Sequence, residues 1–201
     1  MACCQSCTSV RPHYRKVLWF ALAVNALMFV VEIVMGVQSG SLSLLSDSLD
    51  FFGDAANYGI SLWVLGMALH KRARASLLKA ATMAVFGGWI LLLTVYRWWW
   101  QGDVPNYHEM GVVGVLALAA NLLTAWVLYA YRDGDSNMQS VWLCSRNDAV
   151  GNLLVMAAAG AVYVTQSKLP DLLVAVLMSC LALSAAWRIG SQAVKELRSD
   201  K

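Results

Sequence analysis

Two short stretches of apolar sequence each pair a metal-binding side chain with an aspartate four residues later. The stretches read LDFFGDA and LCSRNDA, and the pairs are Asp50 with Asp54 and Cys144 with Asp148. A spacing of four residues puts both members of a pair on one helix face, one turn apart. Two such faces in contact would offer three carboxylates and a thiolate, enough for a four-coordinate divalent cation. The pattern therefore predicts a metal site between two helices.

The composition predicts that these helices lie in a membrane. Apolar residues make up 59% and charged residues 13% of the 201 positions, whereas about 25% of residues are charged in a soluble domain. A membrane-spanning helix needs about 20 mostly apolar residues. Six segments meet this requirement, and they are 17–37, 42–69, 77–96, 110–131, 138–164 and 171–190. We therefore expect an all-α membrane protein with six transmembrane helices.

The spans use most of the chain and leave no room for a separate soluble domain. The expected organisation is a cytoplasmic Cys-rich tail at 1–16, a six-helix transmembrane domain at 17–190 and a short cytoplasmic tail at 191–201. The first segment is polar and basic, which differs from the short apolar run of a cleavable signal peptide.

The basic residues predict the orientation of the chain. Twelve of the 15 Lys and Arg residues flank one side of the predicted spans, including Lys79 at the start of the third span. Only Arg97 and Lys168 fall on the other side, and Arg146 lies inside the fifth span. Because cytoplasmic loops collect Lys and Arg, both termini are expected in the cytoplasm. The net charge of +3 thus reports topology and does not indicate nucleic-acid binding.

Further acidic residues fall inside the spans, where each ionisable group costs about 2.5–3.5 kcal/mol on insertion scales. Asp47 shares the helix face of Asp50 and Asp54 and is expected about 10 Å farther out along the axis. We interpret it as a relay or access group for the ion or a counter-proton, with a structural hydrogen bond as the alternative. Glu32 also has two interpretations, a relay group or a structural partner of Arg146. Arg146 is expected to offset negative charge near the site.

Two asparagines follow the predicted site residues by three or four positions. Asn57 comes three residues after Asp54, and Asn152 comes four residues after Asp148. Each is therefore placed to hold a ligand carboxylate in position. A hydrogen bond that only joins neighbouring helices is the alternative.

The amino-terminal tail carries soft donors in the sequence CCQSC, namely Cys3, Cys4 and Cys7, and His13 follows six residues later. Thiols stay reduced in the cytoplasm, so no disulfide framework is expected. We interpret the pattern as a metal-capture tail, with palmitoylation or a chance occurrence as the alternatives.

The segment from Asn25 to Asp54 resembles the signature of the cation diffusion facilitator family of proton-coupled metal exporters. It reads NALMFVVEIVMG and then SLSLLSDSLDFFGD, while CSRNDAVGN in the fifth span looks like the second ligand pair of that family, usually His-x-x-x-Asp. The resemblance implies a six-helix bundle, commonly a homodimer, with a tetrahedral site between the second and fifth helices. Asp50, Asp54 and Asp148 match ligand positions, and Cys144 stands where histidine is common. The usual cytosolic carboxy-terminal domain is expected to be absent, so the chain reads as a truncated form.

These observations lead to one expected function and two alternatives. The expected function is efflux of zinc or cadmium across a bacterial inner membrane by proton antiport. Zinc and cadmium are expected because a thiolate favours soft metals over manganese, magnesium or iron. The metal ion is then the transported substrate, and we expect no tightly bound cofactor, no nucleic-acid partner and no enzymatic activity. The first alternative is a membrane metal-binding protein without transport, or a partner subunit of a full-length exporter. The second is a small transporter of organic cations.

Overall fold

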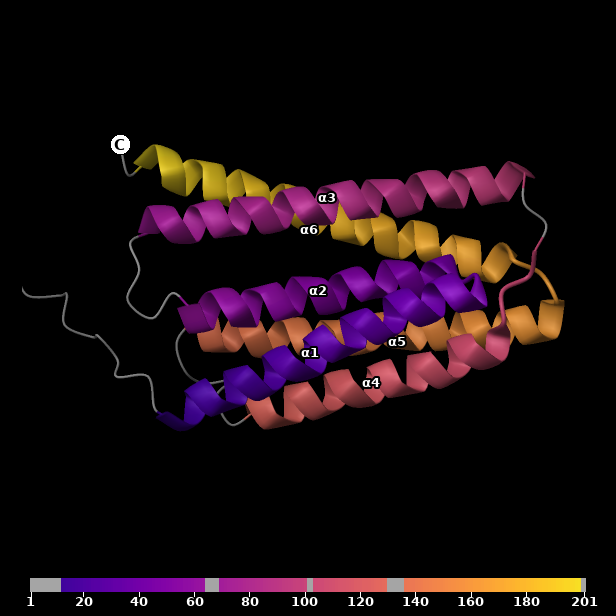
Figure 1. Ribbon diagram of the computed structural model, residues 1–201, viewed down its shortest axis with the longest axis horizontal. Helices are drawn as coiled ribbons and strands as arrows, with labels where there is room; N and C mark the ends of the chain where they lie inside the picture. The colour runs from indigo at the N-terminus through magenta and orange to yellow at the C-terminus, as the bar shows by residue number, and fades with distance from the viewer. Residues whose placement is uncertain (1–11, 64–68, 101–102, 130–135, 200–201) are drawn as a thin grey trace, which may run out of the picture.

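The computed structural model describes residues 12–63, 69–100, 103–129 and 136–199, and within them the side chains of 15–62, 73–100, 103–129 and 148–198. This part of the chain is helical, with six helices that run along one common direction (Figure 1). The helices are α1 (Pro12–Ser39), α2 (Leu42–Trp63), α3 (Leu69–Trp100), α4 (Tyr107–Tyr129), α5 (Ser136–Thr165) and α6 (Leu169–Ser199). The predicted all-α bundle of six helices is confirmed.

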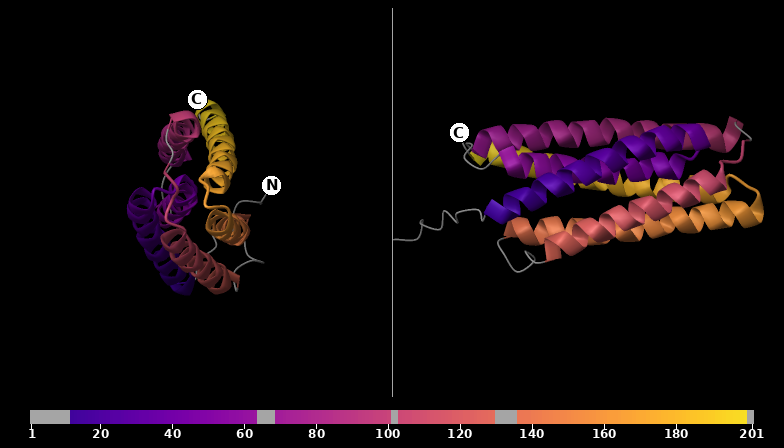
Figure 2. Two further views of the ribbon diagram at one scale, coloured as in Figure 1. Left: turned by 90° about the vertical axis from the view of Figure 1, so that its right-hand side faces the viewer. Right: turned by 60° about the horizontal axis from the view of Figure 1, so that its bottom comes forward.

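The helices form a group of four and an attached pair. Helices α1, α2, α5 and α4 contact one another in a closed ring, and α3 and α6 pack together as a pair against α2 and α5. The end-on view in Figure 2 shows the α3–α6 pair beside the four-helix group. Helix α2 contacts α1, α3, α5 and α6, which makes it the most enclosed element of the bundle.

The bundle buries polar side chains and exposes apolar ones, as a membrane protein does. Val164 and Trp187 are each 78% exposed, whereas Glu32 is fully buried and Asp47 is 1% exposed. Lipid tails are as apolar as leucine, so outward-facing apolar side chains carry no penalty in a bilayer. Five helices within the described residues are long and apolar enough to cross a membrane. Helix α2 is the exception, because three aspartates interrupt it and its neighbours shield them from lipid.

Local sequence explains where two of the helices begin. Gly40 has a φ of 71° between α1 and α2, a backbone conformation that glycine adopts without steric cost. Before α4, the Asn106 Oδ1 accepts a hydrogen bond of 3.1 Å from the backbone N–H of His108. The Asn106 side chain thus caps the first turn, and its Nδ2 also donates to the Glu109 side chain, to Oε1 at 3.0 Å.

The helices extend beyond several predicted spans. Helix α3 starts eight residues before the predicted position 77, and α6 continues nine residues past position 190. The additional turns are rich in basic residues, so an apolar window marks the lipid-immersed part of a helix and misses its polar ends. Helix α1 begins and α6 ends at the same end of the bundle, as an even number of crossings requires (Figure 1).

Candidate functional site

The predicted ligands of α2 and α5 approach one another in the interior of the bundle. Asp50 and Asp54 lie on α2, and Asp148 lies on α5, which packs against α2. The carboxyl group of Asp148 is near that of Asp54 and within electrostatic range of Asp50. Asp54 is 4% exposed, and the other two are partly buried. Three carboxyl groups in a low-dielectric interior form a strongly cation-attracting region.

Cys144 lies on α5, one turn before Asp148, but its side chain is outside the part of the structure that is described. Among the described residues, no three His, Cys, Asp or Glu side chains lie close enough together to hold a metal ion. The four-ligand set therefore stays a prediction. The side chain of Arg146 also lies outside the described part, so its predicted pairing with Glu32 is untested.

One ligand is held by a neighbour on its own helix. The hydroxyl of Tyr58, which is fully buried, donates a hydrogen bond of 2.8 Å to Asp54 Oδ2. A hydrogen bond of this kind fixes the orientation of a carboxylate that would contact a metal. Tyr58 is not among the residues predicted from sequence, although its i+4 spacing from Asp54 places it on the same helix face.

The two asparagines have different surroundings. Asn57 Oδ1 accepts a hydrogen bond of 2.6 Å from the ammonium of Lys79 on α3. Asn152 is fully buried on α5, and neither polar atom of its amide has a hydrogen-bond partner among the described residues. Their predicted contacts with ligand carboxylates stay predictions.

Lys79 is buried, unlike a basic residue in a water-exposed flank. The charge pattern assigned it to the cytoplasmic flank of a span, but it is 5% exposed and lies six residues inside the apolar segment that begins at Ala73. Its stem passes the open face of Gly53, where an added Cβ would be 3.9 Å from the Lys79 Cε. A lysine with a long stem buries its methylenes while its ammonium reaches a polar partner. The hydropathy pattern does not show which partner a buried lysine will find.

A second missed residue anchors the start of α2. Asp171 of α6 is 1% exposed and accepts hydrogen bonds from the backbone N–H groups of Leu42 at 2.9 Å and Ser43 at 3.1 Å. The hydroxyls of Ser41 and Ser43 each donate to the same carboxylate at 2.6 Å. A carboxylate at a helix amino terminus satisfies free N–H groups and interacts favourably with the helix dipole. Here the capping residue comes from another helix, far away in sequence.

The predicted relay residues Glu32 and Asp47 also meet. They lie on α1 and α2, their carboxyl groups are neighbours, and both are buried. The thiols of the predicted metal-capture tail, Cys3, Cys4 and Cys7, lie outside the described residues, and so does the side chain of His13.

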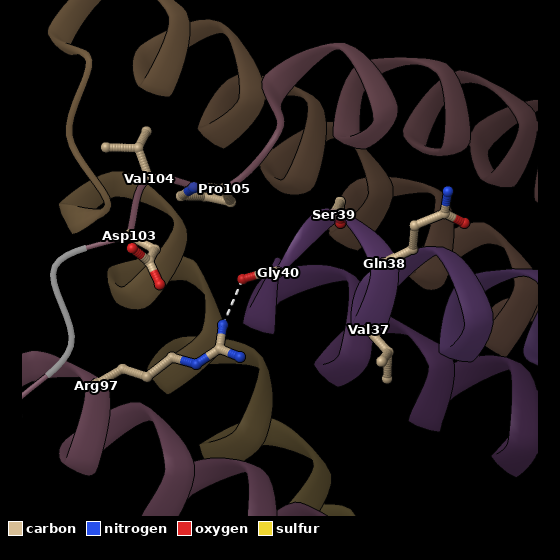
Figure 3. Close-up of a pocket in the computed structure, with 8 residues that line it drawn as sticks. All are labelled: Val37, Gln38, Ser39, Gly40, Arg97, Asp103, Val104 and Pro105. Carbon is tan, nitrogen blue, oxygen red and sulfur yellow. Dashed lines mark hydrogen bonds between the residues drawn. The ribbon is translucent and has the colours of Figure 1, made fainter.

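A pocket of about 240 Å³ lies between the turn that joins α1 to α2 and the segment that follows α3 (Figure 3). Figure 3 shows the Arg97 guanidinium donating to the Gly40 carbonyl, with Asp103 among the other residues that line the pocket. Lys168 in turn donates to the Arg97 carbonyl at 2.6 Å. These contacts join the turns at this end, and none of the predicted ligands lines the pocket.

Known proteins resemble this chain over most of its length. A zinc transporter ZitB of Pectobacterium atrosepticum is 28% identical over 194 residues, covering 90% of this chain and 61% of that protein. The zinc transporter ZitB of Escherichia coli K12 is 29% identical over 90% of this chain and 61% of its own length. The metal cation efflux system protein CzcD of Cupriavidus metallidurans is 28% identical over 85% of this chain and 57% of its own length. The chain thus spans about 60% of the curated relatives it matches.

The membrane location and the absence of enzymatic activity agree with these relatives, which are bacterial and named as transporters or efflux proteins. The predicted location in a bacterial inner membrane is confirmed by this similarity and by the apolar helices. Residues 18–198 match the cation efflux transmembrane domain. With six helices, acidic residues facing one another across α2 and α5, and a domain match along nearly its whole length, the chain belongs to the cation efflux family.

Proposed function

We propose that this chain exports a divalent transition-metal cation, zinc or cadmium, from the cytoplasm in exchange for protons. The ion would bind between α2 and α5 at a tetrahedral site made by Asp50, Asp54, Cys144 and Asp148. The observation that carries the proposal is the meeting of Asp54 and Asp148 in the bundle interior, beside Asp50. The similarity to proteins named zinc transporter and metal cation efflux protein supports the choice of substrate.

Proton exchange follows from the chemistry of such a ligand set. Three carboxylates and a thiolate carry up to four negative charges, which desolvation and mutual repulsion disfavour when no metal is bound. Protons therefore occupy part of the set in the metal-free state, and they leave when the cation binds, because metal ligands must be deprotonated. Metal and protons then compete for the same groups as the bundle opens to one side and to the other.

The thiolate of Cys144 is proposed to set the metal preference. Sulfur ligands are soft and favour cadmium and zinc over manganese. Replacement by histidine, a harder ligand, is expected to reduce the preference for cadmium over zinc.

Flux into proteoliposomes tests the proposal. A metal-sensing dye inside the vesicles reports zinc, cadmium and manganese for the wild type, Asp54→Asn and Cys144→His, with and without a proton gradient. We expect gradient-dependent flux of zinc and cadmium that Asp54→Asn abolishes. Asp103→Asn is the matched control, because it makes the same change at an exposed position.

Other outcomes would favour the alternatives. Metal binding without flux for any metal would indicate a binding protein or a partner subunit of a longer exporter. Flux that does not respond to the gradient would contradict proton coupling, and equal manganese and zinc flux would contradict the role of Cys144.

A homodimer is part of the proposal and needs its own measurement. Native mass spectrometry of the detergent-solubilised chain should give twice the mass of one chain. A monomer that still transports metal would show that the bundle acts alone.

A further inference from the structure

Glu32 of α1 and Asp47 of α2 form a buried acid pair outside the proposed metal ligands. Glu32 is 0% exposed and Asp47 is 1% exposed. None of their four carboxyl oxygens receives a hydrogen bond from any donor in the described part of the chain. Buried polar groups nearly always have such a partner, so four unpaired oxygens at one place call for an explanation.

Close packing of the backbone brings the two carboxyl groups together. Gly36 lies one turn after Glu32, and a Cβ added there would be 2.9 Å from the Leu45 side chain, so α1 and α2 approach closely at this level. From the other side, a Cβ added to Gly151 of α5 would be 3.7 Å from the Asp47 Oδ1. The pair is therefore enclosed by α1, α2 and α5, with two glycines providing the space.

The two groups are compatible with one another only if a proton is present. The carboxyl groups of Glu32 and Asp47 are neighbours in the interior of the bundle. Two ionised carboxylates both accept hydrogen bonds, and neither can donate one, whereas a protonated carboxyl group donates to an ionised one. Such like-charge pairs hold a proton between them because both cannot ionise at close range.

Among the described side chains, which do not include that of Arg146, the ionisable groups that act on the pair are acidic. They are Asp50, on α2, and Asp148, from α5. The buried Lys79 bonds to Asn57, ten residues farther along α2 than Asp47. Helix α4, which packs against α1, presents the uncharged side chains of Asn121 and Thr124 to the interior.

We propose that Glu32 and Asp47 share one proton and form a proton site separate from the metal ligands. The proton lies between one Glu32 Oε and one Asp47 Oδ. Along the bundle axis, the pair lies at the level of the half of α2 that is nearer the Gly40 turn. This level is between the predicted outer surface and Asp50. It keeps a proton ready at this level while the metal occupies its own ligands. This role in transport rests on the proposed function, whereas the shared proton does not.

Infrared spectroscopy of the full chain in lipid measures the proton directly. A protonated carboxyl group has a carbonyl band that shifts in deuterated water, and saturating zinc removes the contribution of metal ligands because they ionise on binding. We expect Glu32→Gln/Asp47→Asn to lose the intensity of one protonated acid. Asp103→Asn should lose none. If the double variant lost no carbonyl intensity, or the intensity of two protonated acids, the shared proton would be contradicted.

A conservative variant keeps the test valid if the double variant does not fold. Glu32→Asp retains both acids but shortens one side chain, so the hydrogen bond between the carboxyl groups weakens. We expect the carbonyl band to shift in frequency without a change in intensity. An unchanged frequency would contradict a contact between the two groups.

Two further readouts separate this inference from the proposed function. The part of the cadmium–thiolate absorption that Cys144→His removes should appear in the wild type and persist in the double variant. Its absence in the wild type would contradict the proposed metal site and leave the acid-band result standing. In vesicles, the double variant should keep zinc–zinc exchange and lose zinc flux driven by a proton gradient. Retained gradient coupling would overturn the transport role of the pair.

Discussion

Two successive levels of α2 differ in how their neighbouring carboxyl groups are hydrogen-bonded. At its first turn, the Asp171 carboxylate receives four hydrogen bonds from Ser41, Leu42 and Ser43. One to two turns farther along, Asp47 receives none from the described residues. A saturated carboxylate stabilises one arrangement, whereas an unsaturated one has capacity for a proton or a cation. The contrast indicates that the first turn anchors α2, whereas the segment from Asp47 to Asp54, here called the working region, is the part that we propose handles protons and metal.

The largest expected effect comes from removing a carboxylate in the working region. Asp54→Asn should reduce zinc flux by at least about 100-fold, more than the 10–100-fold that loss of an outer partner of a metal ligand costs. The unfolding temperature should stay the same or rise, because a buried charge is removed. Zinc flux in proteoliposomes checks the loss of transport, and thermal unfolding in detergent checks the unfolding temperature. A variant that loses stability along with flux would place Asp54 among the anchors.

The complementary change removes the anchor. Asp171→Ala leaves the N–H groups of Leu42 and Ser43 and two hydroxyls without their acceptor. We expect a loss of about 3 kcal/mol in the free energy of unfolding, since hydrogen bonds to charged groups contribute about 1.5–3 kcal/mol. Unfolding in denaturant measures this free energy, and Asp103→Ala, at an exposed position, is the control. Equal stability of the two variants would show that the Asp171 contacts are not structural.

A smaller effect should follow from loosening a ligand without removing it. Tyr58→Phe deletes the hydroxyl that donates to Asp54. We expect zinc binding to weaken by roughly tenfold, because the carboxylate loses a group that orients it. Competition with a zinc-sensing dye gives the Kd, and Tyr96→Phe, at an exposed position of α3, is the control. An unchanged Kd would mean that α2 itself orients Asp54 sufficiently.

The smallest predicted effect concerns the packing that forms the acid pair. Gly36→Ala puts a Cβ 2.9 Å from Leu45, and we expect a loss of about 1–3 kcal/mol from overpacking. Gly160→Ala is the matched control on α5, because its added Cβ meets nothing within 4 Å. That variant should gain up to about 1 kcal/mol, since alanine favours a helix over glycine. Thermal unfolding of both variants should give opposite signs, and the same sign would contradict close packing at Gly36.

The candidate site was only partly predictable from sequence. Four-residue spacing and the cost of intramembrane charge single out Asp50, Asp54 and Asp148 as candidates, because both depend on local geometry and composition. Their role as metal ligands stays a prediction. The same reasoning placed Lys79 at the cytoplasmic flank, because a basic residue near the end of an apolar segment normally reaches water. The structure buries it against α2, where Asn57 accepts its hydrogen bond.

The sequence by itself determined the helices and their membrane location, because apolar runs of sufficient length have no other stable way to satisfy their backbone in lipid. It also determined which faces of the second and fifth helices carry acidic groups, through the period of the α-helix. Only the tertiary structure decided that Asp171 caps α2 and that Glu32 meets Asp47. These contacts join residues from separate helices, and their formation depends on how closely the backbones approach at positions such as Gly36. Helical periodicity specifies a face, but the partner of that face is decided by packing.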